Sequence, residues 1–303
     1  MAERIEYRRR HEPVGALFPR AQGPAEALRF ALPAERVAFF REHGYVAPIR
    51  VLDVAQLQAL RDGMTRMTSP GYPRAGELIG LSKQAGEPTA TPQMIYFQGA
   101  WLAEEAFHDI LFHPAIAVPA AQLLEGGVRF FHDQVFFKPA KHGGVVAWHQ
   151  DYSYWQRTAP IGHLTCFIAL DDATLDNGCL HVIPGSQRWN LLPTVKLVGG
   201  DEDMEAIKQV LSPEQRAAFK PTPIQLKAGE CSFHHPLTLH GSYANRSERP
   251  RRSFVLNFMK PDTKSASDKP LMPGAAVVPP GQVVQGDDFP LVLDKVQVAG
   301  IAG

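Results

Sequence analysis

The hydrophobic period of the chain changes near Val128, and this change restricts the possible folds more than any other feature. Before Val128, apolar residues recur every three to four positions, as they do on one face of a helix. After it, apolar and β-branched residues come in short runs with a period close to two. Helices followed by many short strands predict a sheet-based core on which the helices pack.

Five segments after Val128 have the length and the aromatic or β-branched content of strands. They are 128–139, 163–170, 179–184, 230–236 and 251–260. Turn-forming residues separate them, as at Lys141–Gly144, Asp176–Gly178 and Pro184–Ser186. We therefore expect a mainly β fold with flanking helices, whose core is a double-stranded β-helix of the jelly-roll or cupin type.

Helical signals fill the first part of the chain. Pro33 suits the first turn of a helix that ends at Gly44, and Asp53 suits the N-cap of a second helix that runs to about residue 67. Two further helices are expected near 103–112 and 114–125, after a loop at 69–92 that is rich in Pro, Gly, Ser and Thr.

These signals predict one main domain. Residues 1–33 lack clear periodicity and are expected to form an N-terminal extension, and residues 34–303 a single jelly-roll domain. Within that domain we expect a helical insert at about 202–219 and a C-terminal tail from about 261, to which no chemistry is assigned.

The charge balance excludes several partners. Lys and Arg together number 31 and so do Asp and Glu, so the chain has no long-range field to attract nucleic acid or anionic lipid. No apolar run reaches membrane-spanning length, and the basic start has no apolar segment of a secretory signal. Only three cysteines are present, which predicts a reducing, cytoplasmic location. No pattern indicates the oligomeric state.

A candidate metal site begins at His149 and Asp151. In an extended segment residues i and i+2 point to the same side, so one imidazole and one carboxylate can bind the same ion. A distal histidine, His240, follows in a Gly-Ser turn. Two histidines and one carboxylate on one face of an octahedral ion leave three open positions, as non-haem iron(II) oxygenases require.

The His-x-Asp pair is a weak signal when taken alone. With 12 histidines in the chain, such a pair is expected by chance about once. A surface or core histidine beside an unrelated aspartate therefore remains an alternative. Arg251 strengthens the metal hypothesis, because strand alternation turns its side chain toward the inside of the barrel, where a guanidinium needs an anion. A dicarboxylate co-substrate would supply that anion, and a salt bridge at the rim is the alternative.

Several ordered motifs resemble the phytanoyl-CoA dioxygenase family of 2-oxoglutarate oxygenases. They are WHQD at 148–151, DNGCLHVIPGS at 176–186, HGSYANRS at 240–247 with Arg251, and REHGYVAPIRVLD at 41–53. The likeness covers roughly residues 35–260. One departure is Gln187, where the family turn often carries histidine.

The resemblance implies residue roles. It implies that His149, Asp151 and His240 bind Fe(II), and that O2 and 2-oxoglutarate are co-substrates. It implies further that Arg251 binds the distal carboxylate of 2-oxoglutarate with help from Ser242, and that Gln134 and Phe167 line the co-substrate pocket. Ordinary barrel packing is the alternative for Gln134 and Phe167.

The expected activity is hydroxylation of a small, partly apolar organic molecule, with release of succinate and CO2. Asp151 favours hydroxylation, since related halogenases have a small residue at that position. Desaturation or ring formation at the same iron, a zinc-dependent hydrolase and a non-catalytic jelly-roll binding protein remain alternatives. The identity of the substrate is not encoded in any motif that we find.

Overall fold

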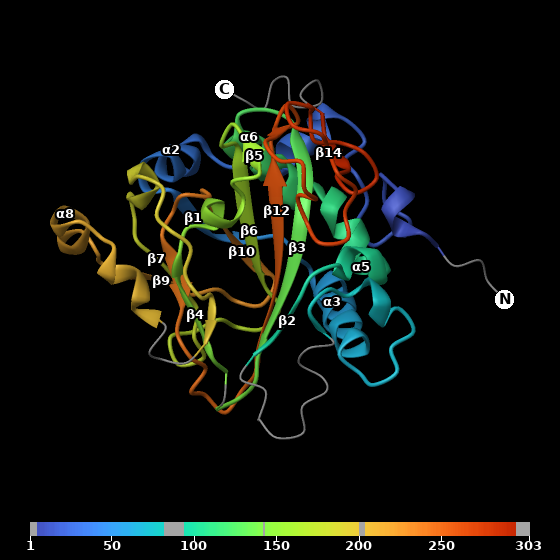
Figure 1. Cartoon of the computed structure of the whole chain (residues 1–303). Coiled ribbons are helices and arrows are strands. Elements are labelled where there is room, and N and C mark those ends of the chain that lie inside the picture. The colour runs from blue at the N-terminus through green and yellow to red at the C-terminus, as the bar shows by residue number, and fades with distance from the viewer. Residues whose placement is uncertain (1–4, 82–93, 142, 200–203, 295–303) are drawn as a thin grey trace.

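The computed structural model describes residues 5–81, 94–141, 143–199 and 204–294 (Figure 1). In these residues two antiparallel sheets face each other, and helices cover the outer face of the larger sheet. The predicted jelly-roll core flanked by helices is confirmed. Among the described helices, none is both long enough and apolar enough to cross a membrane.

The larger sheet has seven strands, in the order β1-β10-β6-β12-β3-β14, with β2 also paired to β3. Long strands lie at its centre and short ones at its edges. The strands are β1 (Tyr45–Arg50), β2 (Ile95–Phe97), β3 (Val128–Lys138), β6 (His163–Ala169), β10 (Glu230–His234), β12 (Arg251–Met259) and β14 (Leu291–Leu293).

The smaller sheet has five strands, in the order β8-β4-β11-β7-β9. These strands are β4 (Val145–His149), β7 (Leu180–Val182), β8 (Val198–Gly199), β9 (Thr222–Ile224) and β11 (His240–Ser242). A third pair, β5 (Thr158–Ala159) with β13 (Lys264–Ser265), ties the C-terminal segment to the residues that follow β4.

Most helices pack on the outer face of the larger sheet, as α3 (Val54–Met67) and α5 (Glu105–Asp109) show in Figure 1, whereas the short helix α8 (Pro213–Ala217) lies beside the smaller sheet. The main ones are α2 (Ala34–His43), α3 (Val54–Met67), α4 (Ala100–Ala103), α5 (Glu105–Asp109) and α6 (Pro114–Leu124). Asp53 caps α3 as predicted, in a reciprocal capping box with Gln56. Gly44 ends α2 with a left-handed φ of 78°, which favours glycine. Pro33 precedes the first helical residue as the N-cap, one position earlier than we expected.

Strand alternation on β12 separates the two cores. Phe254, Leu256 and Phe258 are fully buried in the cluster that the helices share with the outer face of the larger sheet. Val255 belongs instead to the cluster between the two sheets, beside Phe167. The alternation of apolar and polar residues on this strand therefore fixes which side chains enter the barrel.

Other expectations were less accurate. The helix expected near 103–112 is α4, α5 and the 3₁₀ turn Ile110–Phe112 in succession. The described part of the expected insert at 202–219 is a 3₁₀ turn (Ala206–Gln209) and a short helix, α8 (Pro213–Ala217). The expected loop at 69–92 holds a 3₁₀ turn (Ala75–Glu77), and its residues 82–92 lie outside the described residues.

The described residues before α2 pack onto the fold. Residues 5–33 contain two 3₁₀ turns (Tyr7–Arg9 and Leu28–Phe30) and helix α1 (Pro24–Ala27). Phe18 in this segment is fully buried in the helical core. The division of the chain into an extension and one domain stays a prediction.

Candidate metal centre

His149 and His240 lie opposite each other on adjacent strands of the smaller sheet. They are Cα partners in the antiparallel pairing of β4 with β11, and their ring centroids are 4.1 Å apart. Gly241 follows His240, and a Cβ atom at this glycine would lie 3.1 Å from the carbonyl oxygen of Val146 and 3.0 Å from Met204. The absence of a side chain at 241 therefore lets β11 run close to β4, which brings the two imidazoles together.

Both imidazoles are oriented by the same local contact. The Nδ1 atom of His149 lies 2.7 Å from the carbonyl oxygen of Ala147, and the Nδ1 atom of His240 lies 2.9 Å from that of Thr238. A carbonyl oxygen only accepts, so each Nδ1 carries the proton and each Nε2 presents a lone pair. This arrangement is typical of histidines that bind a metal through Nε2.

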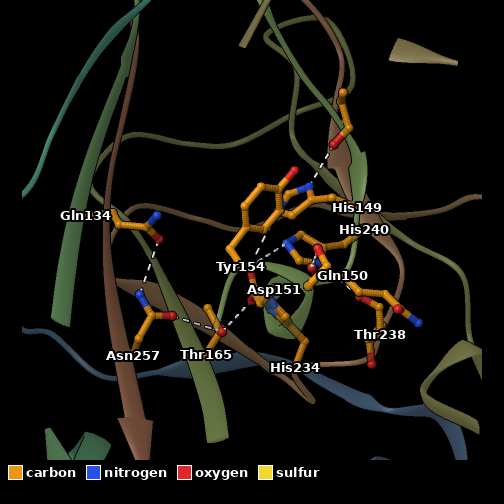
Figure 2. A network of polar contacts seen from close by, with 12 residues as sticks. Gln134, His149, Gln150, Asp151, Tyr154, Thr165, His234, Thr238, His240 and Asn257 are labelled. Atoms are coloured by element: carbon orange, nitrogen blue, oxygen red, sulfur yellow. Dashed lines mark hydrogen bonds and ion pairs between the residues drawn. The ribbon is translucent and has the colours of Figure 1, made fainter. Parts of the chain in front are cut away.

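Asp151 begins a 3₁₀ turn (Asp151–Tyr154) directly after β4. Its Oδ1 atom lies 3.4 Å from Nε2 of His149 and 3.6 Å from Nε2 of His240. The intervening residue, Gln150, turns away and contacts the backbone at Leu192 and Leu237. His149 and Asp151 therefore share one side of the chain, as the i, i+2 spacing predicts (Figure 2).

The electrostatics of the three residues favour a cation. Burial raises the pKa of Asp151, but His240 and the contacts from His149 and His234 outweigh it, so that the pKa lies well below its usual value. Burial, followed by the charge of His149, holds the pKa of His240 well below its usual value. The site thus combines a carboxylate with a neutral imidazole of His240.

The three side chains fit a divalent metal ion. One ligand atom from each lies within 4.8 Å of the others, and all three residues are buried. Two lone-pair nitrogens and one carboxylate oxygen form the donor set of the two-histidine, one-carboxylate triad.

Arg251 lies in the same cavity, only 1% exposed. Its guanidinium donates to the hydroxyls of Ser242 (3.1 Å) and Ser253 (3.3 Å), and its centre lies 5.6 Å from the Phe167 ring. Its Nε has no partner in the described structure, and no described carboxylate lies within ion-pair distance of it. Burial lowers the pKa of Arg251 to about 10. A buried guanidinium without a carboxylate fits an anionic ligand.

The Ser242 hydroxyl contacts both Arg251 and Lys138. It donates to the carbonyl oxygen of Gly178 and accepts from both Arg251 and Lys138. Lys138 is fully buried, and burial, followed by the charge of Arg251, holds its pKa well below its usual value. The Ser242 hydroxyl therefore orients the side chains of Arg251 and Lys138 and has no hydrogen left to donate into the cavity.

One cavity of about 450 Å³ contains every predicted site residue. These residues are Gln134, His149, Asp151, Phe167, His240, Ser242 and Arg251. His132 and Phe136 line the cavity together with Gln134, as expected for residues that alternate on one strand. Tyr154 and Trp155 line it too, whereas Tyr152 packs behind them among apolar side chains.

Some cavity and support residues were missed by the sequence reasoning. Lys138 lies an even number of residues from His132 and Gln134 on β3, so strand alternation places it on the same face and could have predicted it. Asn257 lies on the inner face of β12 and contacts Gln134. Leu271, Met272 and Pro273 line the cavity from the C-terminal segment, where no periodicity marked them.

Comparison with known proteins agrees with this site. The chain is 29% identical over 159 residues to L-proline trans-4-hydroxylase of Streptomyces griseoviridis, covering 48% of this chain and 59% of that enzyme. It is 25% identical over 242 residues to ectoine dioxygenase of Bordetella bronchiseptica, covering 75% of each. The first of the curated relatives are thus matched over less than two thirds of their own length.

A solved structure shares most of the fold. It is the epimerase SnoN of nogalamycin biosynthesis in complex with Fe3+, α-ketoglutarate and nogalamycin RO. Its TM-score is 0.67 at 25% identity, and the match covers 89% of this chain and 99% of that one.

The family profile described as phytanoyl-CoA dioxygenase matches residues 40–253, which include the three candidate metal ligands and Arg251. The chain therefore belongs to the phytanoyl-CoA dioxygenase family, whose members depend on iron(II) and 2-oxoglutarate.

Proposed function

We propose that the protein is an Fe(II)- and 2-oxoglutarate-dependent oxygenase that hydroxylates a small organic molecule and releases succinate and CO2. One observation carries the proposal: a cavity holds a buried two-histidine, one-carboxylate cluster and a buried arginine that has no described carboxylate partner. The cluster fits the metal, and the arginine fits the distal carboxylate of the co-substrate.

The residues have distinct roles in this proposal. His149, Asp151 and His240 would hold iron, with the Nε2 atoms of the two histidines and Oδ1 of Asp151 facing one another. A bound iron with 2-oxoglutarate would supply the oxidative chemistry for attack on a C–H bond. Arg251 binds the distal carboxylate of the co-substrate, and Ser242 orients the guanidinium. Phe167 packs beneath that guanidinium, and Gln134 lines the same cavity.

The remaining cavity wall suggests a partly apolar substrate. Trp155, Leu271 and Met272 form an apolar wall, and the exposed Arg157 contributes a polar group. The Arg157 guanidinium donates to the carbonyl oxygen of Pro270, which ties the C-terminal segment to the residues after the metal motif. A segment beyond the family profile, which ends at residue 253, thus forms part of the cavity wall.

The test is 2-oxoglutarate turnover by the reconstituted protein. Chelator-treated protein is loaded with Fe(II) under argon, and a visible charge-transfer band is expected when 2-oxoglutarate is added. Exposure to air should then release succinate, and a screen of small metabolites should identify the compounds that accelerate this release.

Zinc provides the matched control. Protein loaded with Zn(II) should form neither the band nor succinate, because zinc has no redox chemistry. If Fe(II) protein also forms neither, and Zn(II) protein hydrolyses an ester or amide substrate, the protein is a hydrolase and the oxygenase proposal fails.

A further inference from the structure

The two carboxylate oxygens of Asp151 have separate environments. Oδ1 faces the Nε2 atoms of His149 and His240. Oδ2 faces away from them and accepts from the hydroxyl of Thr165 at 2.7 Å and from Nε2 of His234 at 3.1 Å (Figure 2). The oxygen that faces the candidate metal position and the oxygen that faces the sheet are therefore different atoms.

The two donors to Oδ2 come from directly opposed positions in the larger sheet. His234 on β10 is the Cα partner of Thr165 on β6, and Thr165 is in turn the partner of Asn257 on β12. All three are 3% exposed or less, and the Thr165 hydroxyl also lies 3.0 Å from the Asn257 amide oxygen. The sheet thus presents a buried polar row beneath Asp151, and its strand pairing fixes the positions of both donors.

This row limits how Asp151 can bind a metal. A carboxylate oxygen has two lone pairs, and on Oδ2 both are engaged by donors. Oδ1 alone remains for an ion that His149 and His240 also bind. A carboxylate that used both oxygens would occupy an additional coordination position, and an octahedral ion with three protein ligands has three positions to offer to other ligands.

We propose that His234 is a metal-positioning residue, which together with Thr165 holds Oδ2 and confines Asp151 to single-oxygen coordination through Oδ1. The role needs a proton on Nε2, because a carboxylate oxygen can only accept. The inference rests on the proposed function in one respect, namely that the three side chains hold a metal ion.

The neighbouring histidine offers a matched control. His235 is adjacent in sequence, but its Nδ1 accepts from the backbone N–H of Leu237, and its side chain is not part of the cavity wall. Substitution of His234 therefore removes an imidazole that contacts Asp151, whereas the same substitution of His235 removes one that does not.

The experiment compares four variants of the full chain: His234→Leu, His234→Gln, Thr165→Val and His235→Leu. Affinity for Co(II), measured without 2-oxoglutarate or O2, should fall roughly 10- to 100-fold in His234→Leu and Thr165→Val. His234→Gln keeps an N–H donor and should bind within about threefold of the wild type, as should His235→Leu. Thermal melting identifies any variant that loses the fold.

A spectroscopic readout separates positioning from general destabilisation. In anaerobic protein with Fe(II) and 2-oxoglutarate, the charge-transfer band should shift in His234→Leu and return to the wild-type position in His234→Gln. A folded His234→Leu protein with wild-type Co(II) affinity and an unshifted band would overturn the inference. Failure of His234→Gln to recover, with His235→Leu unchanged, would also overturn it.

The oxygenase proposal can fail separately. If wild-type protein binds Co(II) but not 2-oxoglutarate, the proposed reaction is wrong, and the Co(II) series still decides the role of His234. If the wild type binds no divalent metal, the inference about His234 falls together with the metal site.

Discussion

The Nζ atom of Lys138 lies 2.6 Å from the hydroxyl oxygen of Ser242 and 3.1 Å from the backbone carbonyl oxygen of the same residue. It also contacts the carbonyl oxygen of Tyr243. Lys138 ends β3 and Ser242 ends β11, so this fully buried amine connects the larger sheet to the smaller one two residues after His240.

Substitution of Lys138 by methionine should destabilise the fold. Methionine has a similar length but no donors, so the carbonyl oxygens of Ser242 and Tyr243 would lose a buried partner, which costs about 1–3 kcal/mol. Urea unfolding measures the change in the free energy of unfolding. The control is Lys141→Met, since Lys141 pairs with Glu248 at the surface and should matter by less than about 1 kcal/mol. Equal effects of the two substitutions would contradict this account.

Substitution of Arg251 by methionine should weaken co-substrate binding. Loss of the guanidinium leaves the distal carboxylate of 2-oxoglutarate buried and unpaired, so the KM for 2-oxoglutarate should rise on the order of 100-fold. The adjacent Arg252 pairs with Asp171 on the other side of β12, and Arg252→Met should leave this KM unchanged. Succinate release at varied 2-oxoglutarate measures both. An unchanged KM in Arg251→Met would remove Arg251 from the co-substrate role.

Much of the site could be predicted because its residues obey local rules. The i, i+2 spacing set His149 and Asp151 on one side of the chain, and alternation on residues 251–259 turned Arg251 inward. The same alternation placed Phe254, Leu256 and Phe258 against the helices, where they are buried. Each of these conclusions needs only the period of a strand.

Other features depend on pairing between distant strands. No local pattern states that His234 lies opposite Thr165, or that both reach Asp151. Lysine is usually exposed, whereas Lys138 is buried. Its alternation with His132 and Gln134 on β3 was therefore too weak a reason to predict it as a site residue. The cavity wall at Leu271–Pro273 follows from the docking of the C-terminal segment through β5 and β13.

The C-terminal wall provides a test of substrate selection. Met272→Trp should narrow the cavity and reduce the succinate release that a substrate stimulates, because added volume in a packed wall displaces the substrate. Succinate release without substrate should stay near the wild-type rate, since Met272 is remote in sequence from the metal ligands and is not itself a metal ligand. The control substitution is Val277→Trp, because Val277 belongs to the same segment and is half-exposed. If both rates fall equally, Met272 acts on the fold rather than on the substrate.

Buried His163 should make the fold sensitive to acid. Burial lowers the pKa of His163 to about 3, and its ring lies among Phe131, Tyr152 and Trp155. Because the unfolded chain takes up this proton near pH 6.5 and the folded chain does not until about pH 3, stability falls as pH decreases through that interval. The loss from His163 alone between pH 7 and pH 5 should be about 2 kcal/mol.

Urea unfolding at pH 7, 6 and 5 measures this loss. His163→Phe keeps an aromatic ring and removes the titrating group. Between pH 7 and pH 5 its free energy of unfolding should therefore fall by about 2 kcal/mol less than that of the wild type. A part of the dependence should remain, since burial also lowers the pKa of His132 and of His235 to about 4. His11 is exposed, and His11→Phe should keep the wild-type dependence. A wild-type dependence in His163→Phe would show that proton uptake by this imidazole does not drive acid unfolding.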